Sequence, residues 1–124
     1  MKIDRKAVYE KYNGHCAYCG EKIPFKSMQI DHIFSKRAYK FTPREKKAGI
    51  RLDEMRNLNP SCRMCNFYKS SYSLESFRSN IKTLHKRFSK IFIVRLAVKY
   101  GIIKIHEFDG LFYFEKYKQL KRTK

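Results

Sequence analysis

The sequence predicts an α+β fold with a small cysteine-stapled core, further helices and a terminal β-hairpin. Three observations predict it: four cysteines in two Cys-x-x-Cys pairs, a helical period beyond residue 70, and an alternating period of two near the end. At 124 residues the chain has the length of one ordinary domain. We therefore expect a single domain over residues 1–124, made of a core (3–70) and a C-terminal extension (71–124).

The chain is strongly basic: 29 Lys and Arg residues against 11 Asp and Glu residues give a net charge of +18. The excess is spread over both halves, which favours a compact body that binds a nucleic acid and disfavours a polybasic membrane anchor at one end. The hydrophobic fraction of 43%, with 9 Tyr and 10 Phe, is enough to bury a core. No apolar run could cross a bilayer and no signal peptide is evident, so we expect a cytoplasmic protein without a membrane partner.

The first predicted element is a helix over residues 4–12. Asp4 is placed to cap its N-terminus, and Gly14 lies just past its end. We expect this helix to have a structural task.

All four cysteines have the spacing of metal ligands. The pairs are Cys16/Cys19 and Cys62/Cys65, and two intervening residues let both thiolates of a pair point at one tetrahedral ion. Gly20 supplies a residue that tolerates the left-handed backbone common after such a pair. Two disulfides or two redox motifs are the alternatives, but no export signal or alternating strand–helix context supports them. Because four thiolates leave no open coordination position, the sequence predicts a structural zinc.

A short strand begins at Met28 and runs into Asp31 and His32. Alternation along a strand places these two side chains on opposite sides. The carboxylate can bind a hard cation, and the imidazole can take a proton from water. An Asp-His pair alone is weak evidence, since it also occurs as an ordinary surface pair.

The second cysteine pair strengthens this interpretation. Residues 57–60 are predicted as a loop closed by Pro60, and a helix opens near Ser61 that carries both cysteines and Asn66. The zinc therefore sets the direction of Asn66. A cation held between Asp31 and Asn66 would lie beside the imidazole of His32.

These residues resemble the four-cysteine form of the HNH (His-Asn-His) nuclease family over roughly residues 3–70. The family pattern runs C-x-x-C-G, then D-H, then N-L-x-P-x-C-x-x-C-N/H-x-x-K. In this chain it reads Cys16-Ala-Tyr-Cys19-Gly20, then Asp31-His32, then Asn57-Leu58-Asn59-Pro60-Ser61-Cys62-Arg63-Met64-Cys65-Asn66-Phe67-Tyr68-Lys69.

The resemblance implies a treble-clef-like ββα-metal core, in which two strands and a helix hold a metal ion between them. It implies that His32 is the general base, that Asp31 and Asn66 bind a catalytic Mg²⁺ or Mn²⁺, and that Asn57 holds the loop after His32. Cleavage would leave 5′-phosphate and 3′-hydroxyl ends. Asn66 departs from the His of many members, so both protein ligands offer oxygen, which favours a hard cation.

Basic residues flank the predicted site. Between the cysteine pairs they belong to an arm that contains a predicted short helix with Pro43 at its first position, and in the extension they recur every four residues along one helix face. A solvated surface is one interpretation, and contact with phosphates is the other. The expected DNA-contact residues are Lys36, Arg37, Arg44, Lys46, Lys47, Lys69, Arg78, Lys82 and Lys86.

The extension is predicted to start with helices. Apolar residues spaced by three and four from Leu74 to Ile91, behind a Ser73 cap, predict a buried stripe, and a second helix over 90–100 stops at Gly101. Alternation over 103–115 around Asp109-Gly110 predicts a β-hairpin with a type I′ turn. Its aromatic residues are expected to pack against the helices, with a base-stacking platform as the alternative.

The sequence therefore favours a metal-dependent DNA endonuclease acting on double-stranded DNA. A catalytically inactive, zinc-stapled nucleic-acid-binding module and a protein of the membrane surface are the other candidates. Whether the protein is a monomer or a homodimer stays open.

Overall fold

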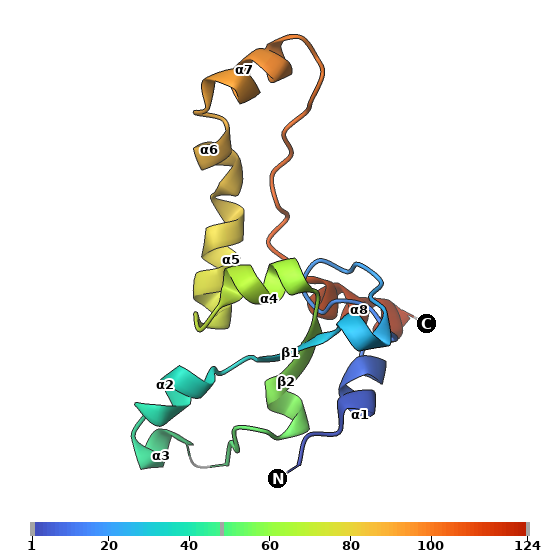
Figure 1. Ribbon diagram of the computed structural model, residues 1–124, viewed down its shortest axis with the longest axis vertical. Helices are drawn as coiled ribbons and strands as arrows, with labels where there is room; N and C mark the ends of the chain where they lie inside the picture. The colour runs from blue at the N-terminus through green and yellow to red at the C-terminus, as the bar shows by residue number, and fades with distance from the viewer. Residues whose placement is uncertain (1, 48, 124) are drawn as a thin grey trace. The chain divides into compact units, whose positions relative to one another are not determined.

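The computed structural model describes residues 2–47 and 49–123, with side chains as far as Gln119 (Figure 1). The chain forms two compact units. Unit 1 comprises Met1–Leu74 and Phe112–Lys124, and unit 2 comprises Glu75–Leu111. The end of the chain, expected to belong to a C-terminal extension, therefore returns to the first unit. That the whole chain behaves as one domain stays a prediction.

Unit 1 is built on a two-stranded antiparallel sheet. Strand β1 (Gln29–His32) pairs with β2 (Leu58–Ser61), so that Asp31 lies opposite Asn59. The predicted loop closed by Pro60 is wrong, because this residue lies within β2. Both strands of a two-stranded sheet are edges, where a residue without an N–H is tolerated, and the Pro60 carbonyl accepts a hydrogen bond from the backbone N–H of Ala17 (2.9 Å).

Helices surround this sheet. Helix α1 (Arg5–Glu10) is capped by Asp4 as predicted, its carboxylate accepting from Ala7 N at 3.1 Å, and it buries Val8 completely. After β2 comes α4 (Arg63–Lys69), whose N-cap is Cys62. The mixture of helices with a small antiparallel sheet confirms the predicted α+β class.

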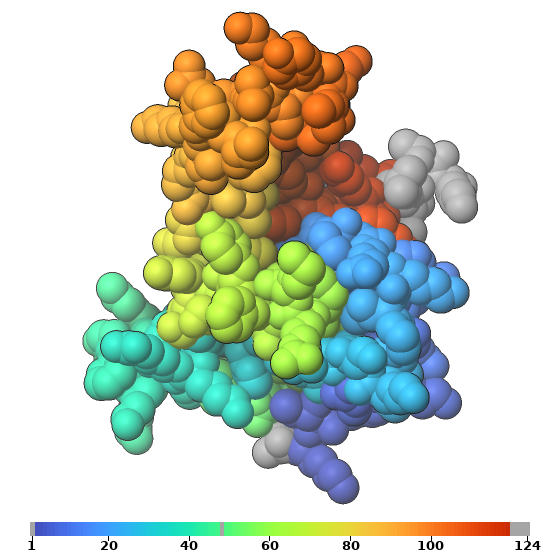
Figure 2. All heavy atoms as spheres, turned by 45° about the horizontal axis from the view of Figure 1, so that its top comes forward, coloured from blue at the N-terminus to red at the C-terminus, as the bar shows by residue number. Residues whose placement is uncertain are grey.

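An arm of residues 33–56 connects the two strands. It contains α2 (Lys36–Lys40), capped by Ser35, and α3 (Arg44–Lys47), which starts one residue after the predicted first position, Pro43. Two single turns, η1 (Phe25–Ser27) and η2 (Met55–Asn57), precede β1 and β2. In Figure 2 the arm, coloured teal, extends to one side of the remainder of unit 1. We call these residues the basic arm.

The predicted terminal hairpin is wrong, because helix α8 (Tyr113–Thr123) begins within its second predicted strand and the described residues 102–111 contain no strand. Side chains cap the start of this helix: Asp109 Oδ1 accepts from Leu111 N (3.0 Å), and Glu115 Oε1 accepts from Phe112 N (2.9 Å). These local bonds favour a turn and a helix over a strand ladder. Phe112 is buried, with its ring centroid 5.2 Å from that of Tyr18.

Unit 2 contains the rest of the helices. Helix α5 (Leu74–Lys82) begins at the last residue before the unit, and α6 (Leu84–Phe88) and α7 (Phe92–Lys99) follow, with α7 ending before Gly101 as predicted. The predicted buried stripe is only partly correct. Phe77 is 1% exposed, but Phe88 and Ile91 are 45% and 50% exposed. The chain forms three short helices here, so the apolar residues do not continue along one helix face. No described helix has the length and apolarity needed to span a bilayer.

The turn after Cys19 offers a test of the packing of α8. Gly20 has φ +83°, and a Cβ there would lie 2.8 Å from Tyr113 Cδ1. We expect Gly20→Ala to lower the free energy of unfolding by about 1–2 kcal/mol for left-handed strain, plus about 1–3 kcal/mol for overpacking. Urea denaturation with zinc present measures the loss.

The matched control is Gly49→Ala. This glycine has the same φ of +83°, but the nearest atom to its added Cβ is Arg56 Nη2 at 3.9 Å. It should show the strain alone. Equal losses at the two positions would contradict the packing of Tyr113 against the turn.

Candidate functional site

The four cysteines meet at one point in unit 1. Their Sγ atoms all lie within 4.8 Å of one another, and the cysteines form no disulfide. Cys19 Sγ and Cys62 Sγ are 3.8 Å apart, which is the edge of a sulfur tetrahedron with metal–sulfur bonds of about 2.3 Å. The donor set and its geometry fit a structural zinc ion, and the two-disulfide alternative does not account for a single cluster.

Local backbone geometry builds this cluster. Cys16 N donates to Glu21 O (2.7 Å) in the turn that Gly20 permits with φ +83°, and Cys65 N donates to Cys62 Sγ (3.4 Å) at the start of α4. We call residues 15–22 the zinc knuckle. Ala17 N is bound to β2 through Pro60 O, so the knuckle, the sheet and α4 have fixed relative positions.

The protonation of the cluster also indicates a cation. Hydrogen bonds from Cys19 and Cys65 hold the pKa of the Cys16 thiol well below its usual range. Hydrogen bonding with Cys16 raises the pKa of Cys65, and it raises the pKa of Cys19 to about 12. The lowered pKa of Cys16 and the raised pKa values of Cys19 and Cys65 thus have one cause, the hydrogen bonds that these sulfur atoms share. Four thiolates this close need a divalent cation between them.

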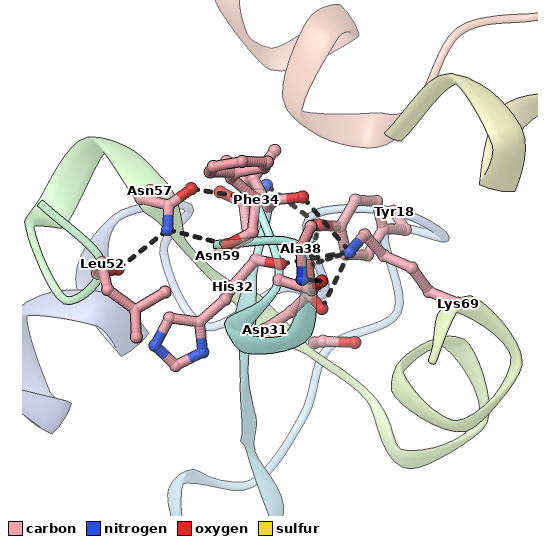
Figure 3. Close-up of polar contacts among 12 residues, drawn as sticks. Tyr18, Asp31, His32, Phe34, Ala38, Leu52, Asn57, Asn59 and Lys69 are labelled. Carbon is pink, nitrogen blue, oxygen red and sulfur yellow. Dashed lines mark hydrogen bonds and ion pairs between the residues drawn. The ribbon is translucent and has the colours of Figure 1, made fainter. Parts of the chain in front are cut away.

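Asp31 lies buried on the side of β1 that faces α4. Its Oδ2 accepts from Tyr18 Oη (2.5 Å), and Lys69 Nζ lies 3.2 Å from both Oδ1 and Oδ2 (Figure 3). Burial raises the pKa of Asp31, while the charge of Lys69 opposes this rise. Burial also raises the pKa of Tyr18, which therefore remains a hydrogen-bond donor.

The structure corrects the predicted role of Lys69 as a DNA contact. Its side chain is 0% exposed, and Nζ also donates to His32 O (3.1 Å). A phosphate therefore has no access to this ammonium. The sequence could have indicated this burial. Lys69 follows Cys65 by four residues and Cys62 by seven, which places it on the same helix face as both predicted zinc ligands.

His32 points to the other side of β1, as alternation predicts, and away from Asp31 and Lys69 (Figure 3). Its Nε2 lies 2.7 Å from Asp53 Oδ1 in the basic arm, with side-chain exposures of 11% for His32 and 33% for Asp53. Sequence reasoning missed Asp53, because it belongs to no motif and lies 21 residues from its partner.

Asn57 is buried and joins the two ends of the basic arm. Its Oδ1 accepts from Phe34 N (2.8 Å), and its Nδ2 donates to Phe34 O (3.1 Å) and Leu52 O (2.8 Å). Its backbone carbonyl accepts from Ile33 N (2.9 Å). These bonds hold the backbone that directly follows His32.

Asn66 lies half-buried on α4, and its side chain makes no hydrogen bond within the described part of the chain. The α4 residue that contacts Asp31 is Lys69, so the structure does not join Asp31 and Asn66 directly. Ionised Asp31 offers about four acceptor positions, and its contacts with Tyr18 and Lys69 leave capacity for one more. Carboxylate and amide oxygens are donor types that a hard divalent cation prefers, so the role of Asp31 and Asn66 as its ligands stays a prediction.

The remaining predicted DNA-contact residues differ in exposure. In the basic arm, Lys36, Arg37, Arg44 and Lys46 are exposed, and Lys47 lies over the Tyr39 ring, 4.5 Å from its centroid. In unit 2, Lys82 and Lys86 are exposed. Arg78 is largely buried, because its guanidinium binds Glu75 and donates to Gly110 O (2.6 Å). This arginine holds unit 2 together and is poorly placed to bind phosphate.

Zinc should hold unit 1 together. We expect one zinc per chain by elemental analysis, and we expect Cys65→Ser or a strong chelator to remove the ion and the cooperative unfolding transition, because structural zinc supplies about 10–16 kcal/mol in small domains. Met64→Ser is the control, since its side chain is 82% exposed on the same helix. A Cys65→Ser protein that unfolds cooperatively at an unchanged temperature would contradict a structural zinc.

Two asparagines should differ in their effect on stability. Asn57→Ala leaves three backbone groups without their partner and should cost at least about 2 kcal/mol, with faster proteolysis within the basic arm. Asn66→Ala removes no hydrogen bond and should change stability by less than about 0.5 kcal/mol. Chemical denaturation and limited proteolysis compare the two variants, and equal losses would contradict the clamping role of Asn57.

Comparison with known proteins finds a family model that matches part of the chain. Residues 16–71, just under half of the chain, match the family model described as HNH endonuclease. Neither the curated proteins nor the solved structures include a match. The matched range contains the four clustered cysteines, Asp31, His32, Asn57 and Asn66. Residues 16–71 of the chain are therefore similar to the HNH endonuclease family.

Proposed function

We propose that this protein is a metal-dependent endonuclease that hydrolyses phosphodiester bonds in double-stranded DNA, with His32 as the general base. The observation that carries the proposal is an available imidazole nitrogen on His32, the residue that follows the predicted cation ligand Asp31 in β1. Nδ1 of His32 makes no hydrogen bond within the described residues, and it is not among the buried side-chain atoms that lack a partner, so solvent reaches it.

The protein's own groups then have distinct tasks. His32 Nδ1 accepts a proton from the attacking water. Asn57 holds the backbone after His32, and Lys69 and Tyr18 hold Asp31 with its carboxylate directed by hydrogen bonds. The exposed cations of the basic arm bind phosphates next to the scissile bond and position the strand.

Asp31 and Asn66 would hold the catalytic Mg²⁺ or Mn²⁺. Such an ion, when bound, stabilises the negative charge that develops on the phosphate oxygens and on the leaving 3′-oxygen. The resulting ends are a 5′-phosphate and a 3′-hydroxyl. The zinc has no open coordination position and takes no part in this chemistry.

One observation favours a second candidate, the inactive nucleic-acid-binding module. The carboxylate of Asp31 is already neutralised by the buried ammonium of Lys69, and a catalytic cation must bind beside that positive charge. A module that only binds nucleic acid would not need the cation. The two candidates differ in whether divalent ions support cleavage.

The decisive measurement is cleavage of supercoiled plasmid by purified zinc-loaded protein with Mg²⁺ or Mn²⁺. We expect His32→Ala to reduce cleavage by about 10²–10⁴-fold, with zinc content unchanged and DNA affinity within about twofold, because proton transfer is needed only in the transition state. His106→Ala is the control, since this histidine is exposed and lies outside the matched residues.

Undiminished cleavage by His32→Ala would overturn the assignment of the base. Tight DNA binding by the unmodified protein without cleavage in either ion would favour the binding module. Linear single-stranded DNA and RNA, tested alongside the plasmid, establish which nucleic acid is preferred.

A further inference from the structure

We infer that Asp53 is a positioning residue that fixes the tautomer and the orientation of His32, so that Nδ1 is the nitrogen that accepts the proton. This inference rests on the proposed function, in which His32 is the base. It adds a residue that belongs to none of the motifs found in the sequence and defines which ring nitrogen reacts.

The contact itself is close and partly shielded. Asp53 Oδ1 lies 2.7 Å from His32 Nε2, with only 11% of the His32 side chain exposed. This separation is within the range of a charge-assisted hydrogen bond. Because most of the imidazole is covered, the bond competes with little water, and it defines the rotation of the ring.

The chemistry of the two groups then defines the tautomer. An ionised carboxylate can only accept hydrogen bonds, so the proton in this bond must belong to Nε2 of His32. A neutral imidazole with Nε2–H has its lone pair on Nδ1. That nitrogen makes no hydrogen bond with any described residue, and the His32 side chain is 11% exposed. The same contact therefore orients the ring and leaves the basic nitrogen open to water.

The placement of Asp53 depends on Asn57. One amide side chain holds Phe34, two residues after His32, and Leu52, the residue before Asp53. A second bond, from Asn57 N to Glu54 O (2.9 Å), fixes the residue after Asp53. Asn57 thus sets the separation of the imidazole and the carboxylate from both sides, which gives it a more specific task than holding the loop alone.

The rival explanation is that the pair only latches the basic arm onto β1. A latch and a positioning residue both predict that loss of Asp53 affects the protein, so stability alone does not separate them. Two measurements distinguish the two explanations: the tautomer of His32, and whether kcat or KM changes. A latch would not select one tautomer, and its loss would not lower kcat alone.

The test uses full-length zinc-loaded protein and two readouts. With ¹⁵N-labelled histidine, the two-bond ¹⁵N–¹H NMR spectrum of the unmodified protein should show His32 as the Nε2–H tautomer. Asp53→Ala should give a mixture of tautomers. In plasmid cleavage with Mg²⁺ or Mn²⁺, Asp53→Ala should lower kcat by roughly 10–100-fold, the usual effect of removing a partner that orients a reactive group, with KM within about twofold.

Three further variants sharpen the result. Asp53→Glu keeps a carboxylate and should restore the tautomer and part of kcat. Glu54→Gln removes the neighbouring negative charge but keeps an oxygen that can accept the hydrogen bond from Arg51 N, and it should leave both readouts unchanged. In a His32→Ala background, Asp53→Ala should cause no further loss, because a positioning residue acts only through the group it positions.

Unchanged tautomer and kcat in Asp53→Ala would overturn the inference, as would an additive loss in the double variant. An unmodified protein that shows the Nε2–H tautomer but cleaves nothing would overturn the proposed function, and it would leave the pair as a latch. If His32→Ala still cleaves DNA, the assignment of His32 as the base is wrong, regardless of which tautomer the unmodified protein shows. The two failures are therefore distinguishable.

Discussion

The constraint on which unit 1 depends is the gathering of four sulfur atoms within 4.8 Å. Four thiolates at this separation would repel one another strongly, so the fully deprotonated cluster needs a cation between them. The cluster joins the turn at Cys16, the end of β2 and the start of α4. Beside it, the backbone of Ala17 makes two hydrogen bonds: its N–H donates to Pro60 O, and its carbonyl accepts from Phe114 N. The sheet, α4 and α8 therefore share one anchor, and a domain with a small apolar core gains from it the rigidity that burial alone would not supply.

From this anchor the two faces of β1 acquire different environments. On one face, Asp31 is enclosed with Lys69 and Tyr18 in a buried polar cluster, which is costly to disrupt because either charge alone would be buried without compensation. On the other face, His32 lies near the surface and meets the basic arm through Asp53. Two adjacent residues of β1 thus differ in environment: the Asp31 carboxylate is buried and held in place, whereas the His32 side chain is partly exposed. The separation suits a site that must hold a cation and also exchange protons with water.

Much of this site could be predicted from the sequence because its determinants are local. The cysteine spacing predicted the cluster, alternation predicted the opposite directions of Asp31 and His32, and Asp4 predicted the start of α1. Contacts between distant segments could not be predicted: Asp53 reaches His32 across the arm, and nothing in its neighbourhood marks it. The aromatic run after Gly110 alternates like a strand, but Glu115 caps the preceding amide and Tyr18 accepts from Tyr113 N, which favours a helix. Pro60 was misinterpreted because a two-stranded sheet tolerates proline where a larger sheet would not. The assignments of the base, the cation ligands and the DNA contacts stay predictions.

The return of α8 to the zinc knuckle has a consequence for synthesis on the ribosome. Unit 2 (Glu75–Leu111) is inserted between two parts of unit 1, so the residues that form the knuckle are made well before the helix that covers it. At about 5–20 residues per second, the interval is on the order of seconds. During it, Tyr18 lacks the ring of Phe112, and the carbonyls of Ala17 and Tyr18 lack their partners from α8. All four cysteines are therefore translated before α8, whereas closure of the core over the knuckle waits for the last helix.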